Sequence, residues 1–273
     1  MSQWKENDLA LGEVTLHYTR TGGDKPPLVL IHGFSDNGLC WTPVARALEQ
    51  DYDIIMPDMV SHGQSSRIAD DQKIDMAANV AQLIETLHLG TPVVGGHSMG
   101  AGVTYDLVVR YPQLVHAFFL EDPAWMLNIP TMTPEMFKSN PMRDWVRKLP
   151  SQSFEELLAG YRKDHPTWDD DLLHAMVNSK KQLDVNVFDK ITQQVFSQDN
   201  RWDETLPNVK QPALVFTADT KKGALVSREA AAKAKELKSD LTIVYVPEAG
   251  HLIRFDKPDV YIRELKEFLG KIK

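Results

Sequence analysis

Short apolar segments recur along the chain at the length of β-strands. They occupy residues 28–31, 53–56, 92–95, 117–120, 213–216 and 241–246. Nearly every position in them is apolar, without the alternation of a half-exposed strand, which is typical of strands buried on both faces of a parallel sheet. The pattern therefore predicts a parallel sheet at the centre of the protein.

Segments with helical periodicity separate several of these strands. Apolar residues gather on one side of a helix in residues 41–48 and 74–87, and residues 229–237 are rich in alanine. A chain that alternates strand and helix builds a doubly wound sheet. The predicted fold class is α/β, with a doubly wound, mostly parallel sheet.

This alternation stops after Leu120 and resumes near Leu206. The stretch between them has helical segments at 154–161 and 171–179 and holds four of the six tryptophans. Because loops of such length are uncommon in a compact domain, we predict a helical cap at 123–206. It is inserted before the last two strands of an α/β core formed by residues 1–122 and 207–273.

The aromatic and methionine side chains of the predicted cap allow two interpretations. They form a small core of their own, which is the more common role of such residues, or they wall an apolar pocket. We take Trp125 and Met126 as candidate substrate-binding residues. Further candidates are Trp145, Tyr161, Trp168, Phe188 and Phe196.

Composition and charge narrow the classes of partner. With 273 residues, 42% hydrophobic and 25% charged, the chain has the composition of one elaborated globular domain. Its net charge of −8 would repel phosphate backbones and anionic lipid headgroups. We expect a small-molecule ester as partner, no nucleic acid and no membrane, and a monomer or small homo-oligomer.

The single cysteine bears on the compartment. Cys40 cannot form a disulfide within the chain, and the first residues lack the apolar core of a secretion signal. These features favour the cytoplasm.

The strongest local motif is Gly-His-Ser-Met-Gly at residues 96–100. It follows the predicted strand 92–95 and precedes a helical stretch at 101–110. A Gly-x-Ser-x-Gly at such a junction is typical of a nucleophile elbow, a strained turn that presents the serine hydroxyl. The same glycines lack the Lys-Ser/Thr ending of a phosphate loop and the spacing of a dinucleotide fingerprint. Ser98 is therefore the candidate nucleophile.

A serine hydroxyl needs a base to take its proton. His251 is the best candidate, because it follows the last predicted strand and would lie at the same sheet edge as Ser98. His32 and His62, in other loops at that edge, are interpreted as turn residues whose rings support the backbone. The remaining histidines are interpreted as surface or edge residues: His17, His88, His116, His165 and His174.

Two N–H donors must meet the oxyanion of an acyl transfer. One is expected from the residue after the nucleophile, Met99, and the other from the loop after the first parallel strand. In that loop, residues 32–35, Phe34 is the candidate second donor.

These residues resemble the α/β-hydrolase superfamily over essentially the whole chain. The resemblance rests on residues 30–34 (Leu-Ile-His-Gly-Phe), 56–65 (Met-Pro-Asp-Met-Val-Ser-His-Gly-Gln-Ser), the elbow and 249–251 (Ala-Gly-His). It implies a serine esterase in which an acid supports the histidine.

The acid is the ambiguous member of the triad. In most relatives it follows the strand after the cap, where this chain has Asp219, but alignment puts Gly223 at the expected position. In a minority of relatives it follows the strand immediately before the cap, where this chain has Asp122. Asp122 is the first candidate, Asp219 the second and Glu121 the third; each could instead be an ordinary strand-end carboxylate that caps a helix or turn.

The nucleophile limits the reaction. The resemblance implies that haloalkane dehalogenases and epoxide hydrolases need a carboxylate where this chain has Ser98. We predict hydrolysis of a carboxylic ester or lactone of a bulky, largely apolar substrate through an acyl-enzyme. No cofactor and no metal are expected, and residues 169–171 (Asp-Asp-Asp) are interpreted as the acidic first turn of a helix.

The substrate is less constrained. Residues 120–125 and 218–227 are faintly similar to bacterial esterases that open macrocyclic lactones such as macrolide antibiotics. A small-molecule receptor and a carbon–carbon bond hydrolase are the alternatives on the same fold.

Overall fold

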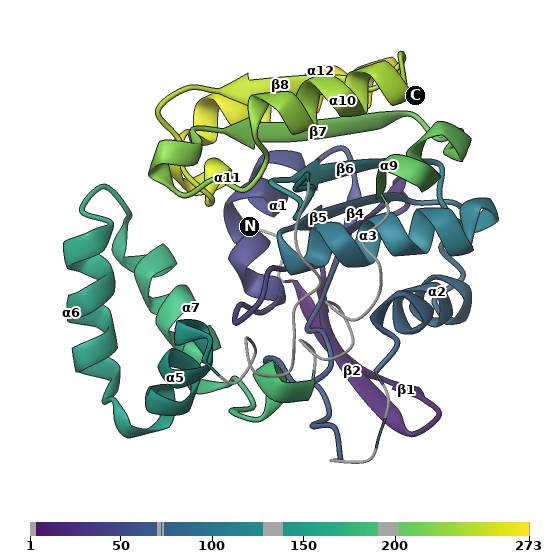
Figure 1. Cartoon of the computed structure of the whole chain (residues 1–273). Coiled ribbons are helices and arrows are strands. Elements are labelled where there is room, and N and C mark those ends of the chain that lie inside the picture. The colour runs from purple at the N-terminus through teal and green to yellow at the C-terminus, as the bar shows by residue number, and fades with distance from the viewer. Residues whose placement is uncertain (1–3, 70–71, 73, 128–138, 191–201, 273) are drawn as a thin grey trace.

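The computed structural model describes residues 4–69, 72, 74–127, 139–190 and 202–272. Within these residues, eight strands form one sheet in the order β1-β2-β4-β3-β5-β6-β7-β8 (Figure 1). Their bounds are β1 (Lys5–Leu11), β2 (Val14–Arg20), β3 (Pro27–Ile31), β4 (Asp53–Pro57), β5 (Val93–His97), β6 (Ala117–Glu121), β7 (Ala213–Ala218) and β8 (Thr242–Val246). The strands from β3 to β8 are parallel, which confirms the predicted fold class.

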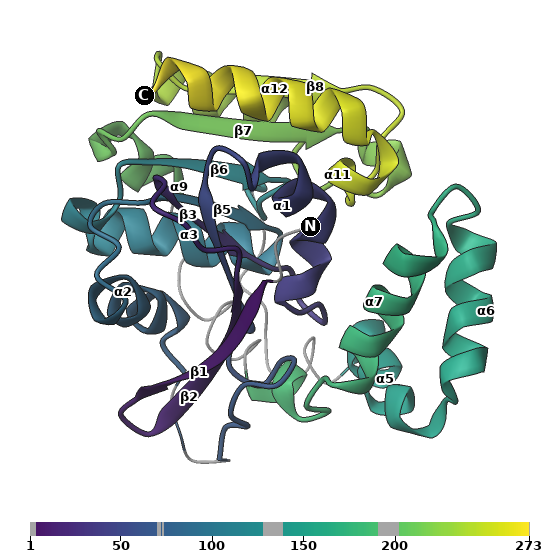
Figure 2. The same cartoon turned by 180° about the vertical axis from the view of Figure 1, so that it is seen from behind.

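Helices cover both faces of the sheet (Figures 1 and 2). One face packs on α1 (Thr42–Leu48), α11 (Ile253–Asp256) and α12 (Pro258–Lys271); the other packs on α2 (Met76–Thr86), α3 (Met99–Arg110) and α10 (Arg228–Leu237). Successive residues of β3 belong to opposite cores: Leu28 and Leu30 to the first, Val29 and Ile31 to the second. Double-sided burial explains why these strands are apolar without alternation.

The N-terminal hairpin was not predicted. Strand β1 pairs antiparallel with β2, and β2 pairs antiparallel with β4. Most of β1 is exposed and polar, as suits an edge strand, so its sequence lacks a hydrophobic run. The hairpin also corrects the interpretation of His17 as a surface or edge residue. Because β1 lies beside it, His17 of β2 is only 8% exposed, and its Nδ1 lies 2.8 Å from Asp8 Oδ1.

The predicted cap contains helices between β6 and β7. They are α5 (Pro141–Lys148), α6 (Phe154–Asp164), α7 (Asp170–Lys181) and α9 (Trp202–Thr205). Helices α5, α6 and α7 stand beside the sheet, beyond the carboxyl ends of its strands (Figures 1 and 2). We keep 123–206 as the proposed bounds of the cap.

Local capping explains where the cap helices begin. Ser153 and Glu156 form a capping box at the start of α6, and the Asp169 carboxylate accepts the Leu172 N–H at the start of α7. Residues 169–171 are thus the acidic start of a helix, as predicted.

Five single-turn 3₁₀ helices complete the described segments. They are η1 (Gly38–Trp41), η2 (Pro112–Leu114), η3 (Leu149–Ser151), η4 (Leu206–Asn208) and η5 (Thr220–Lys222). No helix in the described segments has the length and apolar character needed to cross a membrane.

Candidate active site

Ser98 lies in a sharp turn between β5 and α3. Its backbone has φ 52° and ψ −113°, a conformation that is unfavourable for a residue with a side chain. Two hydrogen bonds hold it: Ser98 N–H donates to Glu121 O at 3.0 Å, and Gly102 N–H donates to Ser98 O at 3.1 Å. The predicted strand–turn–helix geometry is present.

Two glycines of the elbow allow backbones to approach closely. A Cβ added to Gly96 would lie 2.1 Å from Gly100 O, and one added to Gly100 would lie 2.2 Å from Ile31 O. The second contact joins the start of α3 to the end of β3. The elbow is therefore packed directly against the loop that holds Phe34.

His251 lies in the loop between β8 and α11 and faces Asp122. The distance from its Nδ1 to Asp122 Oδ2 is 2.5 Å. Asp122, which follows β6 with φ 45°, is fully buried. Its carboxylate also accepts N–H bonds from Leu225 at 2.8 and 3.0 Å and from Val226 at 3.1 Å. Three donors thus fix the carboxylate in position.

The other two acid candidates have different partners. Asp219 accepts the Lys221 N–H at 3.0 Å and begins η5. Glu121 is fully buried, and its carboxylate accepts hydrogen bonds from the backbone N–H and from the guanidinium of Arg254, each at 3.0 Å. Asp122 is the carboxylate that the structure brings to His251.

The backbone brings Ser98 to the same place. Strands β5 and β6 are adjacent and parallel, with His97 opposite Glu121, so the residues that follow them, Ser98 and Asp122, are neighbours. His251 joins them from the end of β8. The three predicted triad residues therefore converge at the carboxyl edge of the sheet.

His97 was missed by sequence reasoning, because it occupies a variable position inside the elbow motif. It is 2% exposed, its ring centroid lies 4.7 Å from that of His251, and its Nε2 lies 3.0 Å from His251 O. Burial lowers the pKa of His97 well below its usual value, so the ring is neutral. A neutral ring that donates through Nε2 to this carbonyl holds the main chain of His251.

Met99 and Phe34 lie in the two elements from which the oxyanion donors are expected, and their role as donors stays a prediction. Met99 is the first residue of α3, where helix N–H groups lack partners within the helix. Phe34 lies in the loop after β3, half-buried, with its ring edge-on to His62 at 5.8 Å and to Phe188 at 6.0 Å.

The two buried histidines near this loop support the backbone, as predicted. His32 bonds Gly33 O at 2.8 Å through Nδ1 and accepts the Met59 N–H at 2.8 Å through Nε2. His62 bonds Val60 O at 3.0 Å. Burial lowers the pKa of both rings, which keeps them neutral.

Trp125 and Met126 lie where the chain leaves β6. Trp125 is 2% exposed, stacked on Trp202 at 5.0 Å and edge-on to Tyr105 at 5.3 Å. Met126 is half-buried, and its carbonyl accepts the Trp202 indole N–H at 3.5 Å. This placement favours packing as the role of Trp125, and substrate binding by either residue stays a prediction.

The further pocket candidates differ in exposure. Trp168 and Phe188 are buried, and Trp145 is 36% exposed. Phe196 lies outside the described residues. Across the described ranges, no three His, Cys, Asp or Glu side chains are grouped so as to hold a metal ion.

Comparison with known proteins agrees with the fold and the motifs. The sequence model of the alpha/beta hydrolase family matches residues 28–264. The chain belongs to this family. A crystal structure of E-2-(acetamidomethylene)succinate hydrolase superposes with a TM-score of 0.76 at 20% identity, covering 98% of this chain and 100% of that one.

Curated relatives carry several hydrolase names. N-formylmaleamate deformylase of Pseudomonas putida is 28% identical over 93% of this chain and 92% of its own length. Lipase 1 of Psychrobacter immobilis is 25% identical over 97% of this chain and 83% of its own length. An uncharacterized Mycobacterium tuberculosis protein is 35% identical over 102 residues, 37% of this chain, so the match spans only 30% of that protein. The family and these relatives identify the chain as an alpha/beta hydrolase.

Proposed function

We propose that this alpha/beta hydrolase is a serine esterase or lactonase that acts on a bulky, largely apolar substrate. The observation that carries the proposal is the 2.5 Å contact between His251 Nδ1 and Asp122, beside a serine held at φ 52°. A buried carboxylate that orients a histidine next to a strained serine is the arrangement of an activated nucleophile.

The reaction follows from these positions. His251 Nε2 takes the Ser98 proton while Oγ attacks the ester carbonyl, and the Phe34 and Met99 N–H groups bind the oxyanion. His251 then gives the proton to the leaving alcohol, and the acyl group stays on Ser98. Water repeats the sequence and releases the acid. Asp122 keeps the His251 proton on Nδ1 and stabilises the imidazolium.

The substrate class rests on the cap. Its tryptophans and methionines favour an apolar acyl or alcohol group, and a relative named lipase supports ester chemistry. The similarity of residues 120–125 and 218–227 to macrolide esterases extends the proposal to macrolactones, and hence to inactivation of macrolide antibiotics. A cytoplasmic location, in keeping with the single Cys40, is part of the same proposal.

A second candidate is hydrolysis of a small acylated amide acid, favoured by the deformylase and succinate hydrolase among the relatives. Their names imply anionic substrates, which cationic side chains would bind. Among the described residues, the buried cations Arg254 and Lys180 beside this site are already paired with Glu121 and Asp36. This pairing supports the neutral ester as the first candidate.

A substrate panel tests the choice. Purified wild-type protein and Ser98→Ala are assayed against aryl esters, a macrolactone and N-formylmaleamate. Turnover of the aryl esters or the macrolactone by the wild type alone is the expected result. Turnover confined to N-formylmaleamate would show that the substrate is a small amide acid and not an ester. Binding without turnover of any compound would overturn the proposal of an enzyme in favour of a small-molecule receptor. Cleavage confined to a dienone acid in a follow-up assay would indicate a carbon–carbon bond hydrolase.

A further inference from the structure

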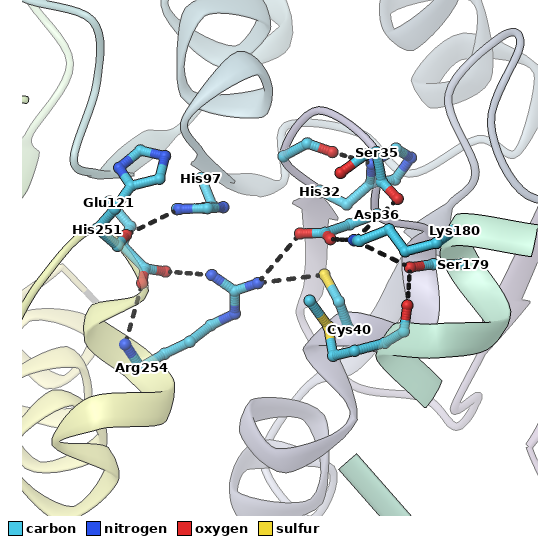
Figure 3. Close-up of polar contacts among 12 residues, drawn as sticks. His32, Ser35, Asp36, Cys40, His97, Glu121, Ser179, Lys180, His251 and Arg254 are labelled. Atoms are coloured by element: carbon cyan, nitrogen blue, oxygen red, sulfur yellow. Dashed lines mark hydrogen bonds and ion pairs between the residues drawn. The ribbon is translucent and has the colours of Figure 1, made fainter. Parts of the chain in front are cut away.

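A buried cluster of charged side chains joins the cap to the core beneath the site (Figure 3). Lys180, near the end of α7, places its Nζ 2.5 Å from Asp36 Oδ1 and 3.0 Å from Ser35 O. Its side chain is 2% exposed and that of Asp36 is 4% exposed. This cation belongs to the cap, whereas the Asp36 carboxylate and the Ser35 carbonyl belong to the loop after β3.

The ammonium of Lys180 stays charged in this position. Burial alone would lower its pKa, but the adjacent Asp36 carboxylate, together with Tyr161, outweighs burial, and the pKa of Lys180 is raised. The Ser179 hydroxyl adds a contact at 3.3 Å. Removing one member of such a buried pair leaves the other without compensation, which is strongly unfavourable.

The loop that Lys180 binds is strained. Ser35 has φ 68°, a left-handed conformation for a residue other than glycine, and it directly follows Phe34. Strained backbone persists only where its surroundings hold it. Lys180 holds the loop by donating a hydrogen bond to the Ser35 carbonyl and another to the carboxylate of the next residue, Asp36. Release of this carbonyl would let the loop relax and turn the Phe34 N–H away from the oxyanion.

A second cation competes for Asp36. Arg254 lies 3.9 Å from Asp36 Oδ2 and is bound by Glu121, the residue before Asp122. Without Lys180, Arg254 would be the cation left beside Asp36 in the part of the chain that the structure describes. The carboxylate would move toward it and carry Ser35 along, which gives the displacement of the loop a direction.

We propose that Lys180 is a positioning residue through which the cap sets the geometry of the loop after β3, which carries Phe34, Ser35 and Asp36. The inference rests on the proposed function, since it assigns Phe34 as an oxyanion donor. Lys180 touches neither substrate nor reacting atoms in this scheme. Its effect is exerted on the transition state through the loop and not on binding of the ground state.

The variants separate positioning from simple loss of a buried lysine. Lys180→Met removes the ammonium at similar length, and Asp36→Asn removes its partner's charge with little change of shape. Lys238→Met is the matched control, because Lys238 is also buried but bonds Val209 O at 3.1 Å and Asp240, after α10. Thermal unfolding is measured for all three.

The readouts are kcat and KM for an aryl ester and the inhibition constants of two compounds. An aryl trifluoromethyl ketone forms a hemiketal with Ser98 whose oxyanion occupies the hole, and the corresponding alcohol cannot. We expect Lys180→Met and Asp36→Asn to lower kcat and the affinity for the ketone by about 10- to 100-fold, with KM and the affinity for the alcohol nearly unchanged. Lys238→Met should change only the unfolding temperature.

The outcomes distinguish this inference from the proposed function. An active wild type with unchanged kcat and ketone affinity in Lys180→Met, or equal losses in Lys238→Met, would overturn the positioning role alone. A wild type that neither hydrolyses esters nor binds the ketone would overturn the function and the inference with it. Should Lys180→Met fail to fold, Asp36→Asn decides by the same criteria.

Discussion

Asp122→Asn is the substitution whose effect follows most directly from the geometry. The carboxylate accepts hydrogen bonds from Leu225, Val226 and His251. An asparagine has a single acceptor oxygen, which the two backbone N–H groups would occupy, so its NH₂ group would face His251 Nδ1. The ring must then accept at Nδ1 and carry its proton on Nε2, where it cannot take the proton of Ser98.

The wrong tautomer sets the magnitude. We expect kcat for an aryl ester to fall by about 10⁴-fold, the size seen when a triad aspartate is amidated without loss of geometry. The displaced hydrogen bonding should lower the free energy of unfolding by about 1–3 kcal/mol. Steady-state kinetics and denaturant unfolding measure the two effects separately.

Asp219→Asn is the matched control. Its carboxylate accepts only the Lys221 N–H among the contacts described, and an amide oxygen can accept the same bond. Activity should stay within about twofold of wild type, because a neutral hydrogen bond replaces a charged one at a surface turn. Loss of activity in Asp219→Asn with retention in Asp122→Asn would refute the assignment of the acid.

Three further results are expected. Gly100→Ala should destabilise the protein by about 3 kcal/mol, because its Cβ would lie 2.2 Å from a backbone oxygen. Gly102→Ala, with open space on the same helix, should be neutral or stabilising by up to about 1 kcal/mol in denaturant unfolding. Equal losses of stability in the two variants would contradict the packing argument. Burial raises the pKa of Cys40 to about 12, so a disulfide reagent at pH 8 should label it only after unfolding, and rapid labelling of the native protein would oppose this. Burial lowers the pKa of His62 below its value in the unfolded chain, so unfolding takes up protons and the free energy of unfolding should fall as the pH drops below about 6.5. His62→Asn should reduce the slope of the unfolding free energy against pH by up to about 1.4 kcal/mol per pH unit. An unchanged slope would exclude His62 as a source of this pH dependence.

The sequence predicts the central sheet well because its strands are buried on both faces. Residues 28–31 have no exposed side, so their apolar run marks the strand directly. Strand β1 has an exposed, polar face and escapes the same criterion. Prediction succeeds where burial alone determines the residue type.

The site likewise contains residues that could be predicted from the sequence and residues that could not. Ser98 was predictable because strand, turn and helix all leave a local signature, and the carboxyl edge of a parallel sheet brings His251 to it. The contacts that support the site have no such signature. Lys180 meets Asp36 across 144 positions of the chain, and neither neighbourhood indicates the other. His97 is hidden because any residue fits its position in the motif.

Fluorophosphonate labelling tests most directly whether Ser98 is the nucleophile. The wild type, Ser98→Ala and the Asp219→Asn control are each treated with the reagent, and their intact masses are measured. One phosphonyl group on the wild type and on Asp219→Asn, with none on Ser98→Ala, is the predicted result. An unlabelled wild type, or equal labelling of Ser98→Ala, would contradict the assignment of Ser98.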